Sequence, residues 1–177
     1  MKDFAYKLIK LGWRFLHFPR EIENDFFRRG GVQIGSRCRI NSNILTAESY
    51  MISIGDDVTI ADNVSFVTHD NSISKVIPGS GNLFGKIRIG DKCFIGSHSV
   101  IMYGVELASE VIVASGSVIT KSFNESRIII GGNPAKKIST WESFAEKHGN
   151  DGIKVASLST DKKKELLLSE NVKLIKR

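Results

Sequence analysis

Two histidines lie in the central part of this chain, and one of them stands where a regular sequence pattern breaks. His98 falls inside the regular run Ile95-Gly96-Ser97-His98, at a position expected to face outward. His69 follows Phe66-Val67-Thr68 and precedes an irregular stretch. An imidazole titrates near neutral pH and can act as a general base. His69 is therefore the candidate base, and the alternative is a histidine that only caps the end of a strand.

The stretch from Asp70 to Lys86 is rich in turn-forming residues, so it is not expected to continue a repeating structure. Long loops on a rigid scaffold often form the walls of binding sites. We therefore expect the loop at residues 69–88 to border a substrate cleft, with Asp70 among the substrate-binding residues. The turn-forming residues are Pro78, Gly79, Gly81, Asn82, Gly85 and several serines.

Metal and serine chemistry have weaker support. A catalytic zinc site needs about three protein ligands that converge on one point. His69 and His98 are the histidines of the central region, with no carboxylate cluster beside them beyond Asp70, so no metal is expected. A serine nucleophile is typically found in a Gly-x-Ser-x-Gly turn after a strand, and the chain lacks this pattern.

The element that must hold His69 is a six-residue repeat. An aliphatic residue recurs at every sixth position between residues 34 and 119, usually followed by glycine or alanine. A period of six matches neither the period of a helix nor that of a strand, and it is typical of a parallel β-helix, in which each hexad forms one side of a coil. The hexads open at Ile34, Ile40, Ile54, Ile60, Ile89, Ile95, Ile101, Leu107 and Val113.

Small residues occupy the fifth position of the hexads, which predicts that this position faces a packed interior. Cys38 and Cys93 both fall there, so we expect buried free thiols in a reducing compartment, not a disulfide or a nucleophile. The segment from Thr46 to Ser53 holds two residues more than the six-fold count. The other fifth-position residues are Val58, Val64, Ser99, Val105, Val111 and Ser117.

Helical patterns flank the repeat. Phe4, Leu8, Leu11 and Phe15 recur at helical spacing and predict an apolar helix face that ends at Pro19. We therefore expect an N-terminal helical cap at 1–30, a β-helix catalytic domain at 31–139 and a C-terminal helical extension at 140–177. Two alternatives remain open, namely a first helix that lies on a membrane and a C-terminal segment that is a loosely ordered tail.

The net charge of +6 resides entirely in the flanks, because residues 1–29 and 160–177 each carry +3 and residues 30–159 are neutral. The sequence contains no nucleic-acid-binding motif, so nucleic acid is not an expected partner. A weak peripheral contact of the basic flanks with an anionic membrane surface remains open. No apolar run is long enough to span a bilayer, and charges interrupt any signal-peptide core, so a cytoplasmic location is expected.

Taken together, these segments resemble the hexapeptide-repeat acyltransferases. The resemblance covers about residues 31–139 and is closest to the galactoside, maltose and nodulation O-acetyltransferases, with the bacterial surface-polysaccharide acetyltransferases beside them. It implies a left-handed parallel β-helix, a homotrimer with active sites between subunits, and acetyl-CoA as donor. The matching segments are Ile34-Gly35, Gly55, 57–64, Thr68-His69 before the loop, 89–96, and the closing Gly132-Asn133-Pro134-Ala135-Lys136.

The resemblance also assigns roles by position. His69 matches the general base, and Asn41 matches an asparagine that holds the acceptor. Arg39 and Ser49 replace a tyrosine and an aspartate that galactoside enzymes use around the sugar, and Arg39 suggests an anionic or nucleotide-linked sugar. The residues that match the lining of the CoA groove are Ser97, Ser115, Thr120, Lys121 and Lys136.

The resulting expectation is an O-acetyltransferase that acts on a sugar or a surface-polysaccharide precursor. The acceptor oxygen would attack the thioester of acetyl-CoA directly while His69 takes its proton. One alternative is N-acetylation of a nucleotide-linked amino sugar on the same scaffold. The other is a non-catalytic β-helix that binds or scaffolds a partner.

Overall fold

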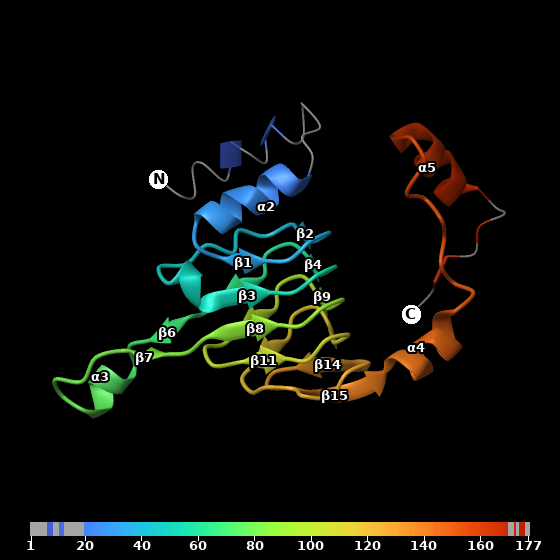
Figure 1. The fold of residues 1–177 in the computed structure, drawn as a ribbon. Coiled ribbons are helices and arrows are strands. Elements are labelled where there is room, and N and C mark those ends of the chain that lie inside the picture. Colours follow the sequence, from blue (N-terminus) through green and yellow to red (C-terminus); the bar gives the residue numbers. More distant parts are fainter. Residues whose placement is uncertain (1–6, 9–10, 13–19, 170–171, 173, 176–177) are drawn as a thin grey trace. The chain divides into compact units, whose positions relative to one another are not determined.

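In a computed structural model of the chain, which describes residues 7–8, 11–12, 20–169, 172 and 174–175, the hexads form the sides of a three-sided β-helix (Figure 1). Its strands pair in parallel from coil to coil. The six-residue repeat is therefore confirmed as the period of the coil sides. Sheet A holds β1 (Gln33–Ile34), β3 (Ile52–Ile54), β8 (Ile87–Ile89) and β11 (Glu106–Leu107).

The other two sides of the β-helix are sheets B and C. Sheet C holds β5 (Ser65–Phe66), β10 (Val100–Ile101) and β13 (Val118–Ile119). Sheet B holds β2 (Arg39–Ile40), β4 (Thr59–Ile60), β9 (Phe94–Ile95), β12 (Ile112–Val113), β14 (Ile128–Gly132) and β15 (Ala135–Thr140), in that spatial order.

The core is the column of side chains predicted from the repeat. Ile60, Ile95, Ile101 and Val113 are completely buried, and Ile34, in the first coil, is only half-buried. All nine fifth-position residues are buried, including Cys38, Cys93 and the larger Ile44, and both thiols are free. The predicted inward orientation of that position is confirmed. Burial of this apolar surface stabilises the stack by about 25 cal/mol per Å² removed from water.

In eight of the nine hexads the backbone turns the corner through a residue in the left-handed conformation, the exception being the hexad that opens at Ile40. This residue is the fourth of its hexad, and the hexad pattern had not marked it. Asparagine, aspartate and glycine are favoured in this conformation, although other residue types also occupy it here. His98 is one of these corner residues, with φ of 61°. The full set in the hexads is Arg37, Asp57, Asn63, Lys92, His98, Gly104, Glu110 and Gly116.

Side chains also bind one coil to the next at the corner that follows sheet A. The Ser36 N–H donates to Asp56 Oδ1 at 2.7 Å, and the Asp56 N–H donates to Asp91 Oδ1 at 2.8 Å. The Asp91 N–H in turn donates to Ser109 Oγ at 3.0 Å. The hydrogen bonds from Ser36 hold the pKa of the Asp56 carboxyl below its ordinary value. Third-position Ser and Asp residues therefore satisfy backbone donors that the corner leaves unpaired.

Helix α2 (Arg20–Arg29) covers the first coil (Figure 1). Its Phe27 is fully buried, and Asn24 Nδ2 donates to the carbonyl oxygen of Cys38 at 3.1 Å. Arg28 donates to the carbonyl oxygens of Ile34 and Gly35 at 3.0 and 2.6 Å. These bonds satisfy acceptors at the end of the stack.

The predicted helix before α2 lies mainly outside the described residues. Residues 7, 8, 11 and 12 are helical, and Leu8 and Leu11 are about half exposed. Phe4, Phe15 and Pro19, on which the prediction also depended, are outside the described part of the chain.

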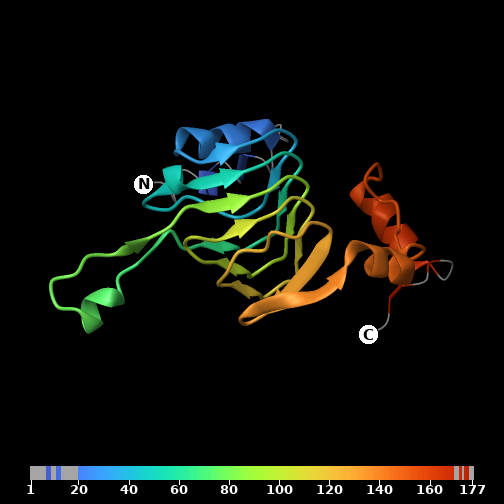
Figure 2. The ribbon, with the colours of Figure 1, turned by 60° about the horizontal axis from the view of Figure 1, so that its bottom comes forward.

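The loop after His69 leaves the β-helix as a two-stranded ribbon (Figure 2). Strands β6 (His69–Asp70) and β7 (Leu83–Phe84) are antiparallel, with His69 paired to Phe84. Helix α3 (Ile73–Val76) lies between them in the sequence. The irregular segment therefore starts and ends at one corner of the rigid stack, and the 3₁₀ helix η1 (Ser49–Met51) occupies the expanded segment of the first coil.

Residues 140–177 form a compact unit separate from residues 1–139. It contains α4 (Trp141–His148) and α5 (Thr160–Leu168). Each helix has an N-cap, because Thr140 accepts from the Ser143 N–H and Ser159 accepts from the Lys162 N–H. No helix within the described ranges has the length and apolar character needed to cross a bilayer.

The close stacking at the corners predicts that Gly90→Ala destabilises the fold. A Cβ at Gly90 would overlap the backbone nitrogen of Ser109 in the next coil, so a coil must shift to accept it. We expect a loss of roughly 1–3 kcal/mol in the free energy of unfolding, measured by urea denaturation. Gly81→Ala is the control, because a Cβ there meets nothing within 4 Å. Equal stability of the two variants would contradict the stacking explanation.

Candidate active site

His69 lies at the C–A corner, which we define as the residues that follow the strands of sheet C: 67–69, 102–104 and 120–121. The corner is rigid because the Val67 N–H donates to the Ile101 carbonyl and the Met102 N–H donates to the Ile119 carbonyl. The His69 side chain is 41% exposed, which leaves it accessible to a substrate. An accessible imidazole is thus carried by a stiff scaffold, as general-base catalysis requires.

A carboxylate that the sequence analysis missed holds the imidazole. Glu48 Oε2 lies 2.9 Å from His69 Nδ1, and the same oxygen accepts a hydrogen bond from Thr68 Oγ1 at 2.7 Å. The Glu48 side chain is 15% exposed. The hydrogen bonds from Thr68 and then His69 hold the pKa of the Glu48 carboxyl below its ordinary value. The carboxylate is therefore ionised at neutral pH and acts only as an acceptor.

Phe84 from the returning strand β7 flanks the imidazole. The centroids of the His69 and Phe84 rings are 5.7 Å apart, with the rings inclined at 45°. The Gly85 N–H donates to the Thr68 carbonyl oxygen at 3.2 Å and ties β7 to the corner. The ring of His69 is therefore restrained by a carboxylate and by an aromatic side chain.

Asp70 has a local partner. Its Oδ1 accepts a hydrogen bond from the Ser72 N–H at 2.7 Å, and this bond holds the pKa of the carboxyl below its ordinary value. The carboxylate thus stabilises the turn that begins the loop, in the manner of an Asx-turn. The predicted role of Asp70 in substrate binding stays a prediction.

Ser49 is occupied within its own turn. It is 1% exposed, and its hydroxyl accepts from the Thr46 N–H at 3.0 Å and donates to the Thr46 carbonyl at 2.9 Å. Its neighbour Glu48 instead supplies the carboxylate near His69. The signal that marks this segment in the sequence is its two extra residues, which interrupt the hexad count between Thr46 and Ser53.

The other predicted site residues divide between two corners. Thr120 and Lys121 follow β13 and share the C–A corner with His69. Asn41 follows a strand of sheet B, as do Ser97 and Ser115, and sheet C separates these residues from His69 along the chain. We call this second position the B–C corner (residues 41–42, 61–62, 96–97 and 114–115). One chain therefore does not bring all the predicted residues to one point.

Arg39 and Lys136 lie at opposite ends of sheet B. Arg39 is on β2 and Lys136 is on β15, which are the two end strands of sheet B. Five strand-to-strand steps separate them, or about 24 Å at the usual spacing of ~4.8 Å. Both side chains are exposed. They cannot contact the same small group within one chain.

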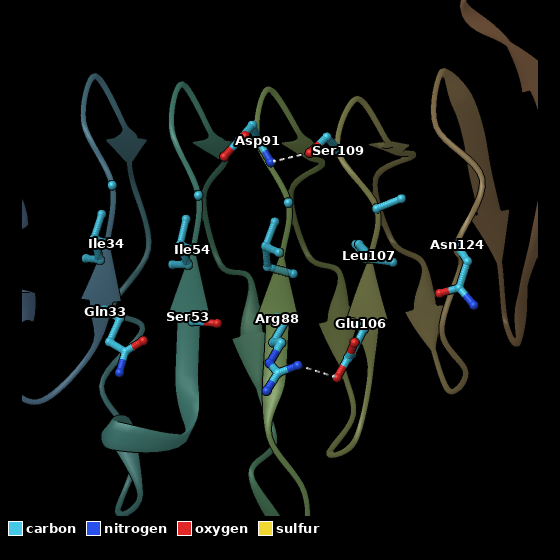
Figure 3. A pocket seen from close by; sticks show the side chains of 15 residues that line it. Gln33, Ile34, Ser53, Ile54, Arg88, Asp91, Glu106, Leu107, Ser109 and Asn124 are labelled. Atoms are coloured by element: carbon cyan, nitrogen blue, oxygen red, sulfur yellow. Dashed lines mark hydrogen bonds and ion pairs between the residues drawn. The ribbon is translucent and has the colours of Figure 1, made fainter.

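A groove of about 550 Å³ on the outer face of sheet A does not include His69 (Figure 3). Outward-facing polar side chains and the small corner residues of the hexads line it, and an ion pair of 3.1 Å joins Arg88 and Glu106 across neighbouring strands. No residue predicted for catalysis or for acetyl-CoA lies among its lining residues. The described ranges also hold no group of three His, Cys, Asp or Glu placed to bind a metal ion.

Comparison with known proteins gives related sequences and structures. A family profile described as "Hexapeptide repeat of succinyl-transferase" matches residues 86–121. Protein CapG from Staphylococcus aureus is 37% identical over 176 residues, which cover 96% of each chain. Galactoside O-acetyltransferase from Escherichia coli K12 is 30% identical over 108 residues, covering 60% of this chain and 53% of the enzyme. The chain thus matches about half the length of that enzyme.

A solved structure shows the same fold. The crystal structure of a maltose O-acetyltransferase from Clostridium difficile 630 superposes with a TM-score of 0.53 at 25% identity. The superposition covers 78% of this chain and 85% of the other.

The buried thiols predict low reactivity in the folded protein. Burial raises the pKa of the Cys93 thiol to about 11, and burial also raises the pKa of Cys38. The Sγ atoms donate to the Ala108 and Gly55 carbonyls at 3.2 and 3.1 Å. We expect both thiols to be unreactive to a disulfide reagent at pH 8 and both to react in guanidinium, since the thiolate is the reactive species. Rapid labelling of the native protein would contradict this assignment.

Proposed function

This chain belongs to the hexapeptide-repeat acetyltransferase family, and on that premise we propose that it is an acetyl-CoA-dependent O-acetyltransferase acting on a sugar or a surface-polysaccharide precursor. The observation that carries the proposal is His69, a partly exposed imidazole fixed at the hinge between the β-helix and its one long loop. The names of the two enzymes compared above, which acetylate galactosides and maltose, support a sugar hydroxyl as acceptor.

The reaction that this geometry supports is a direct transfer. The acceptor oxygen forms a bond to the thioester carbonyl carbon, and its proton passes to His69. The carbon–sulfur bond then breaks, and the proton on His69 is returned to the sulfur of CoA. No acyl-enzyme is needed, which agrees with buried thiols that hydrogen-bond to backbone carbonyls.

The arrangement of the predicted residues supports a homotrimer of left-handed β-helices. His69, Thr120 and Lys121 lie at one corner, whereas Asn41, Ser97 and Ser115 lie at the other. A site that uses both groups needs the C–A corner of one subunit to face the B–C corner of the next. Acetyl-CoA and the acceptor would then bind between subunits. Arg39, exposed on β2 two residues before Asn41, favours an acceptor that carries a negative charge.

We also propose a division of the chain into a cap at residues 1–30, a catalytic domain at residues 31–139 and an extension at residues 140–177. Buried free thiols agree with a reducing, cytoplasmic setting, in which acetyl-CoA is available.

The function is tested by screening sugars and nucleotide sugars with labelled acetyl-CoA. The product is analysed by mass spectrometry before and after mild alkali, which removes an ester but leaves an amide. We expect an alkali-labile acetyl group, whereas an alkali-stable one would identify N-acetylation. If calorimetry detects no binding of CoA, the enzyme proposal fails and a non-catalytic β-helix is favoured.

His69→Ala is expected to lower kcat by about 10²-fold or more with folding intact, because it removes the general base. His98→Asn is the control, since it alters an exposed histidine of the same β-helix at a left-handed position that asparagine tolerates. Its turnover should stay close to that of the wild type. Near-normal turnover of His69→Ala at saturating acceptor would overturn the assignment of the base.

Subunit mixing tests the shared site. We expect His69→Ala and Asn41→Ala each to have low activity as separate proteins. After the two variants are unfolded together and refolded, some sites combine an intact His69 with an intact Asn41 from different chains, and activity should return. A mixture no more active than its components would show that both residues serve a site within one chain, or that Asn41 has no part in it.

A further inference from the structure

We propose that Glu48 is a positioning residue for the transfer reaction, which holds the His69 imidazole so that Nε2 is the nitrogen that takes the acceptor's proton. The proposal rests on the proposed function, since it requires His69 to be the base. The observation that supports it is the contact of Glu48 with two residues of the next coil. Glu48 precedes Thr68 by 20 residues and His69 by 21, and its Oε2 is hydrogen-bonded to both side chains.

The backbone around Glu48 is held by hydrogen bonds that do not involve His69. The Ser49 hydroxyl bridges the N–H and the carbonyl of Thr46, and the Met51 N–H donates to the Glu48 carbonyl at 2.8 Å. Glu48 is therefore the residue that precedes a hydrogen-bonded turn, η1. The two extra residues of this segment form that turn, so they supply the carboxylate that a regular hexad would not place there.

The bonding pattern fixes the tautomer of the imidazole. An ionised carboxylate has no hydrogen to donate, so the hydrogen between Glu48 Oε2 and His69 must be on Nδ1. In the neutral ring Nε2 is then the basic nitrogen, because the partner of one ring nitrogen decides the state of the other. The Thr68 hydroxyl donates to the same carboxylate oxygen and lies 3.3 Å from Thr46 Oγ1, so it is a second restraint on that oxygen.

The restraint on His69 is two-sided. Glu48 binds the ring edge at Nδ1, and Phe84 packs near the ring at 5.7 Å between centroids. The backbone pairing of His69 with Phe84 in the β6–β7 ribbon keeps these contacts in register. Loss of the carboxylate would free the ring to rotate or change tautomer while leaving the corner backbone intact. A general base loses efficiency in that case even though its side chain is still present.

The test compares Glu48→Ala and Glu48→Gln with a matched carboxylate elsewhere. Glu48→Ala removes the acceptor, and Glu48→Gln keeps the shape but removes the charge. We expect kcat to fall about 10- to 100-fold in Glu48→Ala, within the range of general-base catalysis, with KM for acetyl-CoA changed less than about threefold. Glu110→Gln is the control, because that side chain is 24% exposed and pairs with Lys92 and Arg127 at 3.7 and 3.8 Å.

A spectroscopic measurement separates positioning from a purely structural role. Nitrogen-15 NMR of labelled histidine should show His69 protonated at Nδ1 in the wild type and in Glu110→Gln, and a mixture of tautomers in Glu48→Ala. The double variant Glu48→Ala with His69→Ala should be no slower than His69→Ala alone, because residues that act as one unit are not additive. If Glu48→Ala fails to fold, kcat, KM and the histidine NMR spectrum are measured on Glu48→Gln instead.

The possible results distinguish a failure of the Glu48 proposal from a failure of the proposal that His69 is the general base. If His69→Ala abolishes turnover while both Glu48 variants keep kcat within twofold and the wild-type tautomer, Glu48 is structural and the inference is wrong. If His69→Ala itself retains turnover, the general base has been misassigned and the proposed mechanism fails first. Reduced kcat in the Glu48 variants with full activity in Glu110→Gln supports the inference.

Discussion

The structure depends on the close stacking of coils at their corners. Each corner must reverse the chain while the backbone of one coil lies against the next, as at Gly90 and Ser109. Small second residues permit that approach, and a fourth residue with positive φ completes the turn. The aliphatic column is then buried, and the third-position ladder from Ser36 to Ser109 satisfies donors at one corner. The resulting stack is stiff because these constraints recur at the same place in each coil.

The proposed general base lies where this regularity is interrupted. The first coil gains two residues between Thr46 and Ser53, and the second coil is interrupted by the loop after His69. Both interruptions fall on the C–A corner, and coil stacking brings Glu48 next to Thr68 and His69. In the irregular part of the first coil the turn that begins at Glu48 places a carboxylate against an imidazole of the next coil. The rigid neighbours supply the geometric precision that both groups need.

The remaining predicted site residues are divided between two corners of the β-helix, which is the basis for the proposed association of subunits. A single three-sided stack presents its site residues at two corners, separated by sheet C, and the outer groove on sheet A contains none of them. A long, thin donor such as acetyl-CoA suits a cleft between two such stacks, because each contributes a straight row of corner residues.

The sequence by itself determined the period, the inward-facing positions, the free buried thiols and the location of the loop, because a strict six-residue repeat allows only one face of each strand to be buried. It also singled out His69, whose position at the break is visible without coordinates. Glu48 could not be found in this way, since its partners Thr68 and His69 lie 20 and 21 residues away and meet it only through stacking of an irregular coil. The separation of Asn41 from His69 was likewise invisible, because the repeat does not state which of three corners a residue occupies once an insertion has shifted the count. Only the tertiary structure decided these two points, since both depend on which corner of the coil each segment reaches.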